Sequence, residues 1–311
     1  MSRIALATAI AAHALDDDLP PLLRALHAAG MAADVRAWDD PTVAWSRYDL
    51  VLLRSTWDYT MRFAEFMAWC ERIAQTTRLL NPLDVVRWNT DKRYLAQLEA
   101  IGIPIVPSDF GVPGDDAGAL VADCLAAYPD AGEIVIKPTI GAGSRDARRH
   151  RRDALDAMRE HIRRLLAAGR SVLLQPYLAS VDSAGETALM YFDGEFSHAI
   201  RKGPLLRADE DPTRALFATE HIRARTPGAD ERALADRVIA SLPLLVDSDH
   251  PLPYARVDLI RAGDGSAGDG SAGDGSPCVL ELELAEPSVF LDHDAGAAER
   301  FAQVLARRLA C

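Results

Sequence analysis

Apolar runs with the period of a strand or a helix alternate along the first eighty residues. Segments 3–9, 33–38 and 49–54 are predicted strands, and segments 19–29 and 63–73 are predicted amphipathic helices. The third strand is apolar almost throughout, as is typical of a parallel strand covered on both faces. The pattern predicts a βαβ-type N-terminal domain, and the absence of a GxGxxG motif argues against the usual dinucleotide-binding form.

The rest of the chain alternates helical patterns with strands that carry polar residues. Predicted helices cover 89–100, 119–128, 153–168, 230–242 and 295–309. Predicted strands cover 78–80, 133–138, 171–178, 186–191, 195–200, 258–261 and 279–284, and Asp193-Gly194 is a strong hairpin signal. Residues 262–276 are three copies of Ala-Gly-Asp-Gly-Ser, which we expect to form a disordered hairpin tip because such a repeat cannot bury a face.

The strand at 279–284 alternates apolar and acidic residues. Glu281 and Glu283 are therefore predicted on one face, with Leu280, Leu282 and Leu284 in the core. If the strand that begins at Asp258 pairs with it, a third carboxylate joins them, and three hard oxygen ligands suit Mg²⁺. The alternative is a solvated strand face that keeps an edge soluble.

Only three of the 34 basic residues are lysines, so each merits its own interpretation. Lys137 lies among β-branched residues of a predicted strand, where a half-buried ammonium needs an anionic partner. Lys92 is predicted in the first turn of the helix 89–100, where a cation opposes the helix dipole unless an anion binds there. An ordinary surface lysine is the alternative for Lys92. The third lysine, Lys202, ends the strand that begins near residue 195.

Two loops are candidates for ligand contacts. Gly141, Ala142, Gly143 and Ser144 follow Lys137 closely, and their backbone N–H groups could close over phosphates, although a short glycine loop is most often only a turn. Residues 54–59 follow a predicted parallel strand, at the sheet edge where α/β proteins bind ligands.

In that second loop, Arg54 would suit a carboxylate and Trp57 a flat or aliphatic group. The alternative is a helix N-cap at Ser55 or Thr56 with a packed tryptophan.

Composition narrows the class of partner. Hydrophobic content of 49% and charged content of 26% are those of a globular protein, and a net charge of −12 argues against nucleic-acid and membrane-surface partners. The four cysteines have neither CxxC nor zinc spacing, which fits a reducing cytoplasm. We expect a cytoplasmic protein with a small-molecule partner, and a homodimer stays open.

From about residue 83 to the end, the chain resembles the ATP-grasp family. The resemblance rests on segments 89–92, 134–138 with 141–144, 174–178 and 201–202, together with Asp258 and Glu281-Leu282-Glu283. It implies α/β and α+β architecture, with ATP held between two α+β subdomains behind a pre-ATP-grasp βαβ domain. The implied domains are 1–82 for substrate binding, 83–185 as the central subdomain, and 186–311 as the catalytic subdomain.

The resemblance also implies site residues. Lys92, Lys137 and the loop Gly141, Ala142, Gly143 and Ser144 would contact the phosphates of ATP. Gln175, Pro176, Tyr177 and Leu178 would meet the adenine, with Asp182 or Glu186 near the ribose. Arg201 and Lys202 would reach the transferred phosphoryl group. Asp258, Glu281 and Glu283 would bind Mg²⁺, although Glu283 stands where glutathione-synthetase-like members have an Asn.

Within the family, segments 53–59, 86–92 and 281–288 are similar to the cycloserine-forming cyclo-ligases, which activate the carboxylate of O-ureidoserine and close a ring through a nitrogen of the same molecule. The implied substrate contacts are Arg54, Ser55, Thr56, Trp57, Glu286 and Ser288. Two alternatives stay open: an intermolecular ligase of the dipeptide or glutathione type, and a nucleotide-binding module without turnover.

Overall fold

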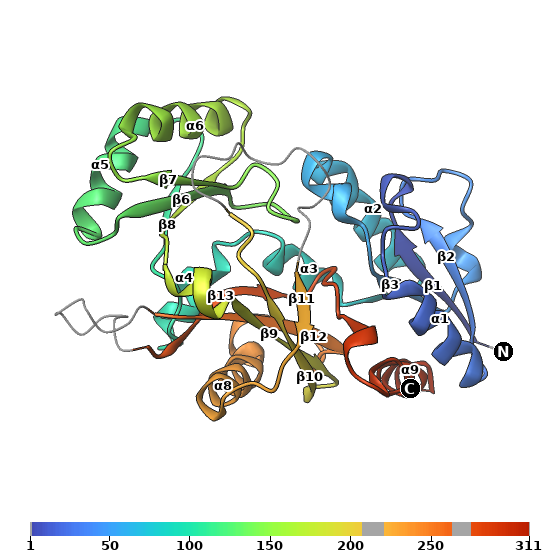
Figure 1. Cartoon of the computed structure of the whole chain (residues 1–311). Coiled ribbons are helices and arrows are strands. Elements are labelled where there is room, and N and C mark those ends of the chain that lie inside the picture. The colour runs from blue at the N-terminus through green and yellow to red at the C-terminus, as the bar shows by residue number, and fades with distance from the viewer. Residues whose placement is uncertain (1, 207–220, 263–274, 311) are drawn as a thin grey trace.

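The computed structural model describes residues 2–206, 221–262 and 275–310, arranged around three β-sheets (Figure 1). The expected tip at 262–276 lies almost entirely outside the described residues. Within the described ranges, the helices are too short or too polar to cross a bilayer.

The N-terminal sheet is parallel, in the order β2-β1-β3-β4. Its strands are β1 (Arg3–Thr8), β2 (Ala32–Ala37), β3 (Leu50–Leu53) and β4 (Arg78–Leu80). Side chains alternate along β1, so Ile4 and Leu6 pack with α1 (Leu19–Ala28), while Ala5 and Ala7 join the core of α2 (Phe63–Thr76). The predicted βαβ-type domain is confirmed, and the apolar β3 is covered on both faces.

The five-stranded sheet is antiparallel, in the order β11-β10-β9-β12-β13. Its strands are β9 (Glu186–Phe192), β10 (Glu195–Lys202), β11 (Ile222–Ala224), β12 (Tyr254–Arg261) and β13 (Pro277–Glu283). One face packs against α8 (Ala229–Leu245) and α4 (Tyr94–Ala100), which follows α3 (Leu83–Asn89). The other face packs against α9 (Ala297–Ala310), which also contacts α1 and so joins this sheet to the N-terminal domain.

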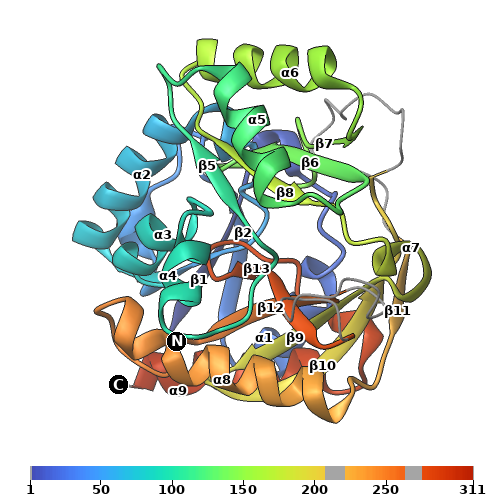
Figure 2. The ribbon, with the colours of Figure 1, turned by 90° about the vertical axis from the view of Figure 1, so that its left-hand side faces the viewer.

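The third sheet is antiparallel, in the order β5-β8-β6-β7, and stands above the five-stranded sheet (Figures 1 and 2). It contains β5 (Asp109–Gly111), β6 (Glu133–Pro138), β7 (Arg148–Arg151) and β8 (Val172–Pro176). Helices α5 (Ala117–Ala127) and α6 (Leu155–Ala167) cover its outer face, and α7 (Ser180–Ala184) leads back to β9. The basic segment 145–152 contains strand β7.

Candidate functional site

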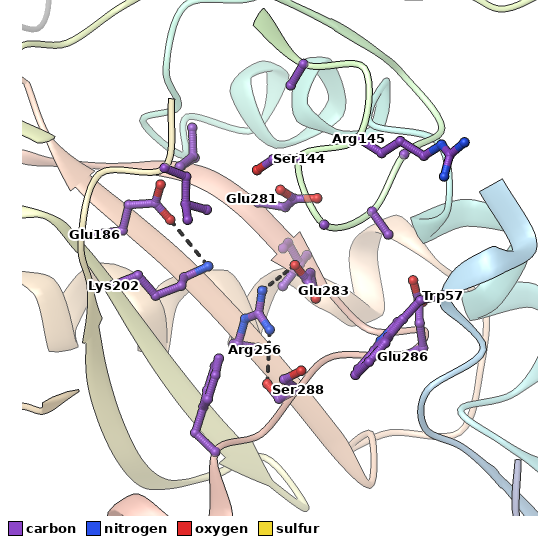
Figure 3. Close-up of a pocket in the computed structure, with 18 of the residues that line it drawn as sticks. Trp57, Ser144, Arg145, Glu186, Lys202, Arg256, Glu281, Glu283, Glu286 and Ser288 are labelled. Carbon is purple, nitrogen blue, oxygen red and sulfur yellow. Dashed lines mark hydrogen bonds and ion pairs between the residues drawn. The ribbon is translucent and has the colours of Figure 1, made fainter. Parts of the chain in front are cut away.

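A cavity of about 740 Å³ is lined by residues of all three parts of the fold (Figure 3). The sheet β5-β8-β6-β7 contributes Lys137 and the loop Gly141 to Ser144 that follows it. The five-stranded sheet contributes charged residues, among them Lys202 and Arg256. The N-terminal domain closes the far end with the acidic run 16–18, Trp57 and Tyr59. The chain thus brings residues more than 200 positions apart into one chamber.

Strand alternation decides which charged side chains face this cavity. Asp258 pairs with Glu281 across β12 and β13, Arg256 pairs with Glu283, and Lys202 pairs with Glu186 across β10 and β9. Directly paired residues share a face of the sheet, and residues two apart along one strand share it too. The predicted hairpin between β12 and β13 is confirmed, and it places Asp258 beside Glu281.

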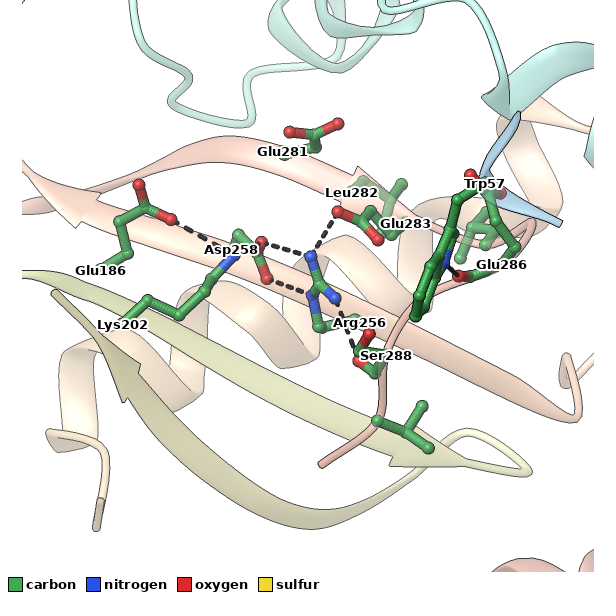
Figure 4. Close-up of polar contacts among 12 residues, drawn as sticks. Trp57, Glu186, Lys202, Arg256, Asp258, Glu281, Leu282, Glu283, Glu286 and Ser288 are labelled. Carbon is green, nitrogen blue, oxygen red and sulfur yellow. Dashed lines mark hydrogen bonds and ion pairs between the residues drawn. The ribbon is translucent and has the colours of Figure 1, made fainter. Parts of the chain in front are cut away.

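These charged groups form a connected ion-pair network (Figure 4). Lys202 Nζ lies 2.5 Å from Asp258 Oδ2 and 3.3 Å from Glu186 Oε2. Arg256 donates from Nε to Asp258 Oδ1 at 2.8 Å and from Nη2 to Asp258 Oδ2 at 3.0 Å, and it also pairs with Glu283. Burial alone would raise the pKa of Asp258, but Arg256 and Lys202 hold it below its usual value.

Two more lysines, Lys92 and Lys137, line the cavity. Lys92 Nζ donates to the carbonyl of Gly141 at 2.7 Å and lies 2.9 Å from Glu281 Oε1. Unlike Lys92, Lys137 forms no hydrogen bond or ion pair with any residue that the structure describes. Burial lowers the pKa of Lys137, and the nearby Lys92 and Lys202 lower it further, against the opposing charge of Glu281. An anionic ligand in the cavity would supply the partner that Lys137 lacks.

The reason first given for Lys92 is wrong. The expected helix 89–100 is two helices: α3 ends at Asn89 and α4 begins at Tyr94, so Lys92 lies in the turn between them rather than in a first helical turn. Its backbone N–H donates to the carbonyl of Thr139 at 2.9 Å instead of pointing at a ligand. The ammonium still lines the cavity, but no helix N-terminus assists it.

Most of the residues predicted to contact ATP line the cavity. They are Lys92, Lys137, Gly141, Ala142, Gly143, Ser144, Gln175, Pro176, Tyr177, Leu178 and Glu186. Asp182 is the exception, because its carboxylate accepts from the hydroxyl of Tyr177 at 2.6 Å and pairs with Arg149, and it does not line the cavity. Of the two residues suggested for the ribose, only Glu186 is within reach of the cavity.

Three of the six predicted substrate residues also line the cavity: Trp57, Glu286 and Ser288, which Figure 4 shows on the side of Arg256 away from Glu186. Arg54, Ser55 and Thr56 are buried and lie outside the lining. Arg54 is 1% exposed and donates to Asp18 Oδ2 at 3.1 Å, which corrects the expectation of a direct substrate contact. Trp57 begins the short 3-10 helix η3 (Trp57–Met61), three residues after the buried Arg54, and is the first residue of this loop to line the cavity.

The predicted contact of Arg201 with the transferred phosphoryl group is also wrong. It precedes Lys202 on β10, so it points to the opposite face of the sheet, where it donates to the carbonyls of Ala184 and Ser183. It holds the end of α7 against β10 and does not line the cavity. Of the predicted catalytic pair, only Lys202 faces the chamber.

A bulge in β13 changes the expected leucine positions. Asp258 pairs with Glu281 but Leu259 pairs with Val279, so Leu280 is an extra residue. Leu282 and Leu284 are buried as expected, whereas Leu280 is only half-buried; both Leu280 and Leu282 line the cavity. Leu280 packs against the edge of a core cluster that contains Ile260 and Cys278, so its predicted core position is confirmed only in part.

The carboxylates fit a magnesium ion in part. Glu281 and Glu283 line the cavity and offer the hard oxygen atoms that Mg²⁺ prefers. Burial together with the neighbouring Glu281 and Asp258 raises the pKa of Glu283 to about 8, despite Arg256, so added positive charge would be favourable there. Asp258 does not line the cavity, and both of its oxygens already accept from Arg256, so the predicted ligand role is corrected for this residue. Among the described residues, no group of three His, Cys, Asp or Glu side chains is arranged to hold a metal ion.

Arg256 is the central residue that the sequence analysis missed. It is 5% exposed, lines the cavity, and joins Asp258, Glu283 and the carbonyl of Ser288. A signal was present: Arg256 precedes Asp258 by two residues in an otherwise apolar strand, so both share a face.

Comparisons with known proteins agree with this architecture. The RimK domain ATP-grasp protein of Sphaerobacter thermophilus superposes with a TM-score of 0.65 at 17% identity, covering 98% of this chain and 100% of that one. The D-alanine–D-alanine ligase of Bacillus anthracis gives a TM-score of 0.63 at 14% identity, covering 100% of this chain and 98% of the other. The fold is therefore the ATP-grasp fold, as expected.

More similar proteins narrow the family. Residues 4–81 match the family described as the N-terminal domain of D-cycloserine synthetase DcsG. The chain is 45% identical to the cycloserine biosynthesis protein DcsG of Streptomyces lavendulae, over 99% of each protein. A crystal structure of D-cycloserine synthetase DcsG superposes with a TM-score of 0.87 at 44% identity, covering 99% of this chain and 100% of that one. The chain belongs to the DcsG family of ATP-grasp enzymes, which confirms the family resemblance.

Proposed function

We propose that this protein is an ATP-dependent, ADP-forming cyclo-ligase that converts O-ureidoserine to cycloserine in antibiotic biosynthesis. The observation that carries the ATP site is Lys137, an ammonium in the cavity with no hydrogen-bond or ion-pair partner among the described residues, which lines the cavity together with Lys92 and the loop 141–144. The family membership supports the choice of substrate. The cavity volume and the net charge of −12 also suit a small molecule better than a nucleic acid.

Different residues of the cavity would bind different parts of ATP and the magnesium ion. Lys92 and Lys137 would neutralise the phosphates of ATP, and the backbone of 141–144 would cover them. The adenine would lie against 175–178, with Glu186 near the ribose. Glu281 and Glu283 would hold Mg²⁺, which would neutralise phosphate charge and hold the phosphates in position when bound.

The centre of the cavity would stabilise the transferred phosphoryl group. A carboxylate oxygen of the substrate attacks the terminal phosphorus of ATP, the bond to ADP breaks, and an acyl phosphate forms. Arg256 and Lys202 lie beside this centre, and Asp258 fixes both of them through buried ion pairs. Preorganised cations of this kind stabilise developing phosphate charge without reorganisation during the reaction.

Ring closure would follow in the same chamber. The ureide nitrogen bound to oxygen attacks the acyl carbon, and inorganic phosphate leaves. Trp57 and Ser288, at the end opposite the nucleotide, are placed to hold the substrate in a folded conformation. Free cycloserine also requires hydrolytic loss of the carbamoyl group of the ureide, which the product masses would report.

ADP release by the purified protein tests this function. With ATP and Mg²⁺, O-ureidoserine alone should release ADP and yield a cyclised product by mass, whereas amino acids supplied singly or in pairs should not. Release that requires two substrates would indicate an intermolecular ligase. Nucleotide binding without ADP release from any substrate would indicate a module without turnover.

Lys137→Met tests the residue that carries the proposal. We expect kcat/KM for ATP to fall by about 100-fold or more, because the phosphates lose a preorganised cation. Arg151→Met, an exposed change on the adjacent strand β7, is the matched control and should keep full activity. Unchanged ADP formation by Lys137→Met would contradict the assignment of this end of the cavity to ATP.

A further inference from the structure

We propose that Glu286 is the general base of ring closure, the group that takes the proton from the attacking nitrogen. This inference rests on the proposed function and concerns its second half-reaction only. Activation of the carboxylate requires no proton transfer, but amide formation does, because the nitrogen must lose its proton as it becomes part of the ring.

Glu286 lies at the junction between the ion-pair network and the substrate end of the cavity. It follows β13 by three residues, is 9% exposed, and lines the chamber together with Trp57 and Tyr59 of the N-terminal domain (Figure 3). The indole N–H of Trp57 donates to the backbone carbonyl of Glu286 at 3.3 Å and fixes this part of the loop. Figure 4 shows Glu186 and Lys202 on one side of Arg256, and Glu286 with Trp57 on the other.

The partners of Glu286 differ from those of the other glutamates that line the described cavity. Glu186, Glu281 and Glu283 each form an ion pair with a cation, respectively Lys202, Lys92 and Arg256. Glu286 forms no such pair among the described residues, and the group that acts on its carboxylate most strongly is a neutral one, the hydroxyl of Tyr59, which lowers its pKa. A neutral donor orients a carboxylate without removing its affinity for a proton as fully as a cation does.

The environment tunes this carboxyl group towards proton transfer at neutral pH. Burial raises the pKa of Glu286 to about 7, against the hydroxyl of Tyr59 and the charge of Lys92, which both lower it. A base is most effective when its pKa lies near the working pH, because enough of it is ionised and it still binds a proton well. Among the other charged groups nearby, Glu281 raises the pKa of Glu286 and Arg256 lowers it. The charge of Glu286 in turn raises the pKa of Tyr254 and of Cys70 in α2.

The proposed step balances without a further reactant. The nitrogen forms a bond to the acyl carbon, the bond between that carbon and the phosphate oxygen breaks, and phosphate leaves with the electron pair. The nitrogen's proton moves to a carboxylate oxygen of Glu286, which releases it to solvent after the product departs. Arg256, which also lines the cavity, would stabilise the departing phosphate.

Glu286→Gln separates base catalysis from substrate activation. We expect formation of the cyclised product to fall by about 100-fold or more, while the acyl phosphate still forms and is trapped by hydroxylamine as a hydroxamate. Glu160→Gln, an exposed change on α6, is the matched control and should make product at the wild-type rate. Product formation at the wild-type rate by Glu286→Gln would overturn the inference, and so would loss of the hydroxamate together with the product.

Tyr59→Phe provides a second test that survives if Glu286→Gln fails to fold. In the wild type, the ionised base is the active form, so kcat for product should fall as pH drops below about 7. The hydroxyl of Tyr59 lowers the pKa of Glu286, so its removal should shift this acidic limb to higher pH. An unshifted limb would overturn the inference. Failure of the wild type itself to make product from O-ureidoserine would instead count against the proposed function.

Discussion

The buried ion pair between Arg54 and Asp18 has a structural role. The guanidinium of Arg54 is enclosed with Asp18, whose carboxylate also accepts backbone N–H groups of Val289, Phe290 and Leu291 at 2.6, 3.2 and 2.7 Å. Asp18 thereby ties the N-terminal domain to the loop that carries Ser288. Arg54 therefore acts on the site through this loop rather than by touching a substrate.

Arg54→Met should destabilise the fold. We expect the free energy of unfolding to fall by about 3–5 kcal/mol, because removing one partner leaves the charge of Asp18 buried and incompletely compensated. Urea unfolding measures this change, with the exposed Arg47→Met as a control that should stay near the wild type. A variant of wild-type stability with a raised KM for the substrate would instead restore the direct contact expected from the sequence.

Strands and turns determine which residues of each motif reach the cavity. The pair Arg201-Lys202 was recognisable from the sequence, but only the orientation of β10 in its sheet reveals that Lys202 faces the chamber. The bulge in β13 and the break between α3 and α4 were not predictable from local periodicity, because long-range pairing and packing produce both. The hairpin of β12 and β13 was predictable, since its alternating carboxylates have a clear period of two.

The junction between α7 and β9 requires a glycine, Gly185. Gly185 has a φ of +72°, and a Cβ there would collide with the backbone carbonyl of Lys202. Gly30, at the end of α1, has a φ of +78° but open space around it. The two glycines therefore have the same backbone requirement and different surroundings.

Gly185→Ala and Gly30→Ala form a matched pair. We expect Gly30→Ala to cost about 1 kcal/mol in unfolding free energy from backbone strain alone. Gly185→Ala should cost about 3 kcal/mol or more, because overpacking adds to the strain, and activity should fall as Lys202 is displaced. Chemical denaturation and ADP release measure the two effects. Equal losses for both variants would show that the contact with Lys202 is unimportant.

At the scale of the whole molecule, the three sheets meet around one chamber. The ATP-grasp architecture was predictable from the sequence, because the lysines, the glycine loop and the carboxylates follow one another in the order typical of the family. Which carboxylates face the chamber did not follow, because Asp258 is covered only when Arg256 and Lys202 meet over it. Arg256 was missed for the same reason: its partners come from other strands and a distant loop.

The central claim is that the substrate's own carboxylate is phosphorylated in this chamber. O-ureidoserine labelled with heavy oxygen in its carboxylate tests it directly, with mass spectrometry of the inorganic phosphate released by the wild-type enzyme. Our account predicts that each phosphate released with product carries one labelled oxygen, because the acyl carbon–oxygen bond breaks on ring closure. Product formed with unlabelled phosphate would mean that water, not the carboxylate, had attacked ATP, and would contradict the account.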